Sequence, residues 1–281
     1  MRNRFLIILL FIFIIQSGVI AQEVKKDTVP ATKAEKKQEK KLYSVVQFLH
    51  ETYLFVKQPV TWRGYDWLKV GIVASTAISF MPFDHGITNA TKPHQKYYYS
   101  FPVEGGRIYG EWYSIGGVSA IFGLYGLIAR NDAAKKITIE LIQAGLYSET
   151  STFFLKIAFG RARPLITDDP YTYKPFTVFD DHFHSFPSGH TTCAMALSTI
   201  MSRHANTLAL KILAYVPVAF TVFSRIYQNK HWVSDVVPAA AIGYFTGNWV
   251  VDLHEGKRHR INVTSLYPPA FSISLDQGEK K

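Results

Sequence analysis

The sequence predicts an all-α protein, a six-helix bundle embedded in a membrane. Apolar residues make up 48% of the 281-residue chain, and beyond residue 66 they gather in six segments with helical character. Basic residues are also distributed unevenly between the connections that join these segments. The six segments cover residues 67–81, 113–129, 137–158, 188–201, 208–223 and 232–253.

Residues 1–21 are predicted to form a signal peptide or an N-terminal anchor. Arg2 and Arg4 precede an apolar run over 5–15, and small residues follow before Gln22. The run is short for a helix that spans a bilayer, which needs ~20 residues, and this favours a cleaved signal peptide over an anchor. Either way the chain is exported to, or inserted in, a membrane. Nucleic-acid binding is therefore not the explanation for its formal net charge of +10.

Three further regions follow this N-terminal segment. Residues 22–42 are lysine-rich and nearly free of apolar side chains, which predicts a solvated linker. The helical core is predicted over 43–255, beginning with an amphipathic or interfacial helix that Pro59 ends, and 256–281 form a C-terminal tail. Several apolar segments are shorter than the ~20 residues that cross a bilayer. The same pattern therefore also suits a soluble or peripherally bound helical domain.

Basic residues gather on the connections at one end of the predicted bundle. They follow the second segment, separate the fourth from the fifth, and follow the sixth: Arg130, Lys135, Lys136, Arg203, Lys211, Lys257, Arg258 and Arg260. By the positive-inside rule this end is cytoplasmic, so 83–112, 159–187 and 224–231 lie on the extracytoplasmic side of a bacterial-type inner membrane. A cleaved signal peptide followed by six crossings would give the opposite orientation. Three arrangements resolve this conflict: the first apolar segment stays in the membrane with its N-terminus outside, residues 43–60 cross or re-enter, or the helices do not span and the domain is periplasmic or only peripherally bound.

Phosphate chemistry is predicted on that second side. The stretches "KIAFGRARP", "PSGH" and "SRIYQNKHWVSD" begin or end helices that meet on one face of an up-down bundle. Two guanidiniums and one ammonium group can neutralise a phosphoryl group, so no metal or cofactor is expected. The residues that these stretches bring to one site are Lys156, Arg163, His190, Arg225, His231 and Asp235.

Each histidine has a predicted role at this site. His231 and Asp235 are four residues apart, and a carboxylate bonded to one ring nitrogen would leave the other nitrogen as nucleophile. His190 would protonate the leaving oxygen. Beside it, Ser188 and Gly189 would expose backbone N–H groups at the positive end of a helix, which is a favourable place for an anion.

The three stretches match K-x6-R-P, P-S-G-H and S-R-x5-H-x3-D in order. In these motifs the sequence resembles the type 2 phosphatidic acid phosphatase family, related in fold to bacterial class A acid phosphatases and vanadium haloperoxidases. The resemblance covers about residues 66–253 and implies a metal-independent phosphatase that acts on an anionic lipid phosphate or diphosphate through a phosphohistidine. It implies His231 as nucleophile, Asp235 as its partner and His190 as general acid. The phosphate-binding residues that it implies are Lys156, Arg163, Ser188, Gly189 and Arg225.

Two other functions stay open at this point. One is a soluble periplasmic acid phosphatase of broad specificity, and the other is a vanadate-dependent haloperoxidase, which the compact core disfavours. His182 and His184, beside two aspartates, could ligate a metal, but a role in lining the loop is favoured. The sequence identifies neither the substrate head group nor the oligomeric state.

Overall fold

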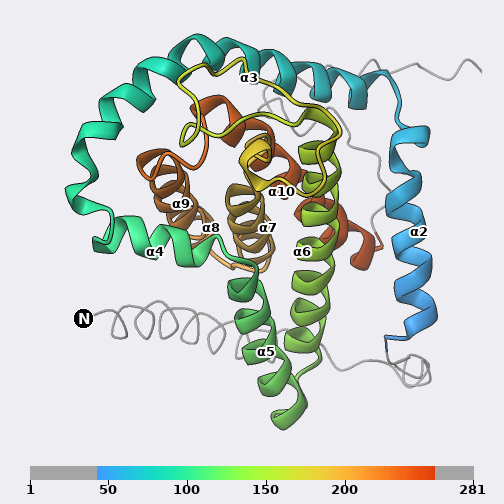
Figure 1. Ribbon diagram of the computed structural model, residues 1–281. Helices are drawn as coiled ribbons and strands as arrows, with labels where there is room; N and C mark the ends of the chain where they lie inside the picture. Colours follow the sequence, from blue (N-terminus) through green and yellow to red (C-terminus); the bar gives the residue numbers. More distant parts are fainter. Residues whose placement is uncertain (1–42, 257–281) are drawn as a thin grey trace, which may run out of the picture.

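The computed structural model describes residues 43–256, and this part of the chain is built from helices (Figure 1). The all-α prediction is therefore confirmed. The predictions for 1–21, for 22–42 and for nearly all of the tail lie outside the described residues. The helices are α2 (Val45–Thr61), α3 (Gly64–Thr91), η2 (Lys92–Tyr97), α4 (Phe101–Tyr109), α5 (Trp112–Ile128), α6 (Asp132–Phe159), η3 (Asp181–Phe183), α7 (Gly189–Arg203), α8 (Leu208–Leu213), α9 (Val216–Tyr227) and α10 (Val233–His254).

Helix α3 runs in a different direction from its neighbours. In Figure 1, α2, α5 and α6 lie roughly along one direction, whereas α3 crosses above the end of α6 and curves down toward α4. Pro82, which cannot donate to the helical hydrogen-bond ladder, lies inside this curved helix. The predicted segment 67–81 is thus part of a longer helix at one end of the bundle. Helix α2 continues past Pro59 to Thr61, so Pro59 does not end it as expected.

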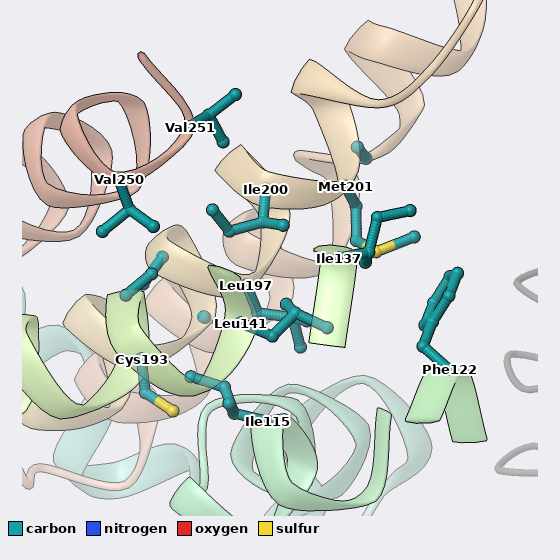
Figure 2. Close-up of a cluster of buried hydrophobic side chains, with 14 of the residues drawn as sticks. Ile115, Phe122, Ile137, Leu141, Cys193, Leu197, Ile200, Met201, Val250 and Val251 are labelled. Carbon is teal, nitrogen blue, oxygen red and sulfur yellow. The ribbon is translucent and has the colours of Figure 1, made fainter. Parts of the chain in front are cut away.

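The apolar core packs between α5, α6, α7 and α10 (Figure 2). Leu141, Leu197 and Val250 are fully buried there. Helices α7 and α10 approach closely because Gly243 has no side chain: a Cβ at this position would lie 2.4 Å from the carbonyl oxygen of Thr192. This contact holds the first halves of both helices together, and both helices begin at the site described below.

Much of the outer surface is apolar. Within the described residues, α3 and the stretch 208–227 are long and apolar enough to cross a membrane, judged by length and composition alone. Only 11% and 28% of their apolar windows are buried inside the molecule. Exposed apolar surface on this scale marks contact with lipid or with a partner rather than with water, and it indicates a membrane protein.

Replacing Gly243 with alanine should destabilise the α7–α10 contact. The new methyl group would meet backbone atoms, which cannot swing away, and overpacking of this kind costs about 1–3 kcal/mol. We expect a lower thermal unfolding midpoint in detergent solution for Gly243→Ala. Gly116→Ala in α5 is the matched control, because nothing lies within 4 Å of its added Cβ. Equal midpoints for the two variants would contradict the packing described here.

Candidate active site

The end of α6 and the starts of α7 and α10 meet at one place. Helix α6 stops at Gly160, which has a left-handed backbone conformation with φ of 57°. A Cβ there would lie 1.8 Å from the carbonyl oxygen of Lys174, so glycine is the residue that fits. The starts of α7 and α10 are joined by a hydrogen bond from Ser188 N–H to the carbonyl oxygen of Asp235, 3.2 Å long. The residues of all three motifs are thereby brought to one end of the bundle.

His231 is buried, with 2% of its surface exposed. Its Nδ1 lies 2.7 Å from the carbonyl oxygen of Ser185, which can only accept, so Nδ1 carries the proton and Nε2 keeps its lone pair. The nearest oxygen of Asp235 is 3.7 Å from Nδ1. The direct bond expected between these two residues is therefore not formed. Ser185 lies between them instead, and its hydroxyl donates to Asp235 Oδ2 over 2.6 Å.

The helix boundary explains this difference. Helix α10 begins at Val233 and Trp232 is its N-cap, so His231 precedes the helix. The four-residue spacing that places two side chains on one helical face does not apply across that boundary. The Asp235 carboxylate points back to the start of its own helix and accepts a hydrogen bond from Trp232 N–H, 2.8 Å long.

The surroundings of His231 keep its imidazole neutral. Burial lowers the pKa of His231 well below the ordinary value, and the positive charges of Arg163 and Lys156 lower it further. Arg225 acts in the same direction. All three predicted phosphate-binding cations are therefore close enough to act on the ring. A neutral imidazole with a free Nε2 is the nucleophilic form of histidine.

Neighbouring groups hold Lys156 and Arg163, whereas one donor of Arg225 has no acceptor among the described residues. Lys156 Nζ donates to the carbonyl oxygen of His184 over 2.6 Å. Arg163 Nη2 lies 2.7 Å from Asp181 Oδ1. Arg225 is 4% exposed, and its Nε has no hydrogen-bond partner within the described residues. A buried guanidinium donor without an acceptor is costly, and an anionic ligand would satisfy it.

The start of α7 differs in detail from the expectation. Ser188 is the N-cap, its side chain accepts from Thr191 N–H, and its own N–H is bonded to Asp235. It therefore does not present a free N–H to an anion. Gly189 and His190 are the first helical residues, whose N–H groups have no acceptor within the helix. A Cβ on Gly189 would lie 3.7 Å from Lys156 Cε, so the lysine side chain stands beside this helix start.

His190 has an acidic neighbour that the motifs do not reveal. Its Nε2 lies 3.1 Å from Oε1 of Glu111, which directly precedes α5. Arg107 also donates to Glu111 Oε1 over 3.2 Å. The neighbouring His190 imidazole lowers the pKa of Glu111, so this carboxyl group is ionised. The signal in the sequence is the alternation of charge at Glu104, Arg107 and Glu111, which are three and four residues apart.

Arg161 is a second residue that the motifs do not include. It is fully buried, and its guanidinium lies 2.6 Å from Asp235 Oδ1 and 2.8 Å from Asp84 Oδ2. The extra arginine in "GRARP" was visible in the sequence. Asp84 was not identifiable, because nothing in its local sequence distinguishes it from a surface carboxylate.

The two loop histidines have partners in their own loop. His184 is buried, and its Nε2 lies 2.8 Å from the carbonyl oxygen of Thr177. His182 is exposed, with Nδ1 3.0 Å from Asp180 Oδ1. These contacts shape the segment that carries Ser185 toward His231.

Comparison with known protein families agrees with the resemblance that the three motifs indicate. The family model of the PAP2 superfamily matches residues 138–258, a range that contains all three motifs. This part of the chain is therefore similar to the PAP2 superfamily.

Two relatives come from Porphyromonas gingivalis. The chain is 34% identical over 103 residues to a lipid A 1-phosphatase, a match that covers 35% of this chain and 20% of that protein. It is 26% identical over 144 residues to a lipid A 4'-phosphatase, which covers 51% of this chain and 61% of that protein. The chain thus spans about a fifth and about three fifths of the length of these relatives.

Two solved structures are also similar. Aquifex aeolicus LpxE matches with a TM-score of 0.42 and 25% sequence identity, over 54% of this chain and 84% of that one. A transmembrane PAP2 type phosphatidylglycerolphosphate phosphatase from Bacillus subtilis matches with a TM-score of 0.49 and 17% identity, over 69% of this chain and 96% of that one.

The lowered pKa of His231 should make stability depend on pH. An unperturbed histidine has a pKa of about 6.5. As the pH falls below that value, the unfolded chain binds a proton at His231 that the folded protein does not, so folding is penalised at low pH. We expect the thermal midpoint to fall less between about pH 7.5 and about pH 5 in His231→Gln than in the wild type. Exposed His50, replaced in the same way, is the control, and an unchanged pH slope in His231→Gln would refute the assignment.

Proposed function

We propose that this protein is a metal-independent phosphatase that hydrolyses a phosphate or diphosphate ester of a lipid. The observation that carries the proposal is the state of His231. Its ring is buried and neutral, its Nδ1 proton is bonded to Ser185, and its Nε2, which has no hydrogen-bond partner within residues 43–256, is close to three cations. This is the arrangement that a histidine nucleophile needs for attack on phosphorus.

The reaction takes two steps. In the first, the Nε2 lone pair of His231 forms a bond to phosphorus, the bond from phosphorus to the ester oxygen breaks, and His190 gives its proton to the leaving oxygen. In the second, His190 takes a proton from water, the water oxygen forms a bond to phosphorus, the bond from phosphorus to His231 Nε2 breaks, and inorganic phosphate is released. His231 then returns to its neutral form.

The charges of the phosphoryl group are met by fixed cations. Lys156, Arg163 and Arg225 neutralise its oxygens, and the helix start at Gly189 adds backbone N–H groups and the positive end of the helix dipole. Ser188 contributes by capping that helix rather than through its own N–H. Asp235 acts on His231 through Ser185.

Two observations support a lipid substrate. The relatives from Porphyromonas gingivalis are named for phosphate groups of lipid A, and the exposed apolar surface of α3 and 208–227 suits a protein that meets its substrate in a membrane. A lipid A-like phosphoglycolipid is therefore the first substrate to test, beside glycerophospholipid phosphates.

We further propose that the site faces the extracytoplasmic side of the inner membrane. The α5–α6 connection, with Arg130, and the first turn of α6, with Lys135, lie at the end of the bundle away from the end of α6 (Figure 1), as the positive-inside rule requires. Helix α2 also starts at the lower end in Figure 1. Residue 45 is then cytoplasmic, an arrangement that agrees with the predicted N-terminal anchor if the N-terminus of that anchor lies outside.

Phosphate release in the presence of EDTA tests the proposed reaction. We expect lipid phosphates to be hydrolysed at the same rate with and without the chelator, and His231→Ala to reduce release to background. His190→Ala should lower kcat by about 10²- to 10⁴-fold, the usual contribution of a general acid. The control is His50→Ala on the exposed part of α2. Full activity in His231→Ala would exclude the mechanism.

Extraction of membranes tests the membrane assignment. An integral protein stays in the pellet after alkaline carbonate or high salt, because its apolar helices remain in the lipid, and detergent then releases it. We expect this protein to behave in that way. Release into the supernatant by carbonate would instead support a periplasmic, peripherally bound phosphatase.

A further inference from the structure

A buried cluster of three charges lies behind the catalytic histidine. The side chains of Asp84, Arg161 and Asp235 are all fully buried. The Arg161 guanidinium uses one terminal nitrogen for each carboxylate, Nη1 for Asp235 at 2.6 Å and Nη2 for Asp84 at 2.8 Å. One planar cation therefore bridges two carboxylates that would repel each other without it.

Arg161 and Asp84 make further hydrogen bonds besides the one that joins them. Arg161 Nε donates to the carbonyl oxygen of Pro170 over 2.9 Å. The Asp84 carboxylate accepts from both the N–H and the hydroxyl of Ser234, at 2.9 and 2.5 Å. Asp84 thereby ties α3 to the first turn of α10. It lies outside the range that the PAP2 family model matches.

Ser185 links this cluster to the nucleophile. Its backbone N–H donates to the carbonyl oxygen of Arg161 over 3.0 Å, and its hydroxyl donates to Asp235 over 2.6 Å. The Arg161 side chain also donates to Asp235, so Arg161, Ser185 and Asp235 form a closed cycle of hydrogen bonds. This cycle of hydrogen bonds fixes the carbonyl oxygen of Ser185, which accepts a hydrogen bond from Nδ1 of His231.

We propose that Arg161 and Asp84 are positioning residues for the nucleophile, acting through Asp235 and Ser185 on the orientation of His231. The inference rests on the proposed function, since it concerns the same reaction. Neither residue touches the reacting atoms. Asp84 fixes the guanidinium of Arg161, Arg161 fixes the Asp235 carboxylate and the Ser185 backbone, and Ser185 sets the tautomer and the tilt of the ring. Helix α3 thus takes part in the catalytic geometry from outside the motifs.

The chemistry explains why such a support is needed. The Nε2 lone pair must point at phosphorus in line with the bond that breaks, and a displacement of ~1 Å can cost about 10²-fold in rate. A carbonyl oxygen on a loop is a mobile acceptor unless that loop is held. The ring of bonds through Arg161, Ser185 and Asp235 supplies this restraint.

Single-turnover kinetics test the proposal. The enzyme is used in excess over a radiolabelled lipid phosphate, so the rate constant does not depend on the fraction of folded enzyme. We expect Asp84→Asn and Arg161→Lys to lower the rate constant of the chemical step about 10- to 100-fold. The enzyme concentration that gives the half-maximal rate should change less than about twofold, because the phosphate-binding cations are intact. Asp66→Asn, the same change near the start of α3, should leave the rate constant unchanged.

A milder variant covers the case in which a broken buried ion pair prevents folding. Ser185→Ala removes only the hydroxyl that bonds Asp235 and leaves the backbone carbonyl in place, and it too should slow the chemical step. Wild-type rate constants in Ser185→Ala, or in a folded Asp84→Asn, would overturn the inference. The proposed function fails separately, if His231→Ala retains turnover.

Discussion

The carboxylate of Asp235 is the group on which the rest of the site depends. It accepts hydrogen bonds from Arg161, from the hydroxyl of Ser185 and from the N–H of Trp232, while the Asp235 backbone carbonyl accepts from Ser188. One residue therefore caps α10, anchors the start of α7 and holds the loop that orients the nucleophile. A buried carboxylate is unfavourable unless such partners compensate for its lost hydration. This requirement explains why a buried arginine stands beside it.

The site combines two opposite electrostatic tasks. Toward the substrate, Lys156, Arg163 and Arg225 supply positive charge, which depresses the pKa of His231 and keeps the ring neutral. Behind the ring, Asp84 and Asp235 share one arginine and leave that cluster with a net negative charge. The histidine lies between an anion-binding face and an anchoring face. Helix α3 carries exposed apolar residues on the outside of the molecule and, through Asp84, also contacts the buried Arg161.

The motifs predict which groups meet at one end of the bundle, because their spacing constrains which helix ends can carry them. The direct pairing of His231 with Asp235 was wrong for a local reason: the helix begins two residues after the histidine. The free N–H expected at Ser188 was wrong for a tertiary reason, since Asp235 on another helix occupies it. Glu111, Arg161 and Asp84 were missed because their contacts with His190, Asp235 and Arg161 span 79, 74 and 77 positions of the chain.

By itself, the sequence determined the all-helical fold and the three motifs, because these depend on apolar periodicity and on residue types at short spacings, and it predicted a nucleophile, an acid and three cations. Only the tertiary structure decided that α3 lies across the end of the bundle, that Ser185 mediates between His231 and Asp235, and that Asp84 and Glu111 join the site. The reason is physical. Local spacing fixes which groups a helix end presents, but the bonds that hold a loop carbonyl or a buried carboxylate are made between segments far apart in the chain.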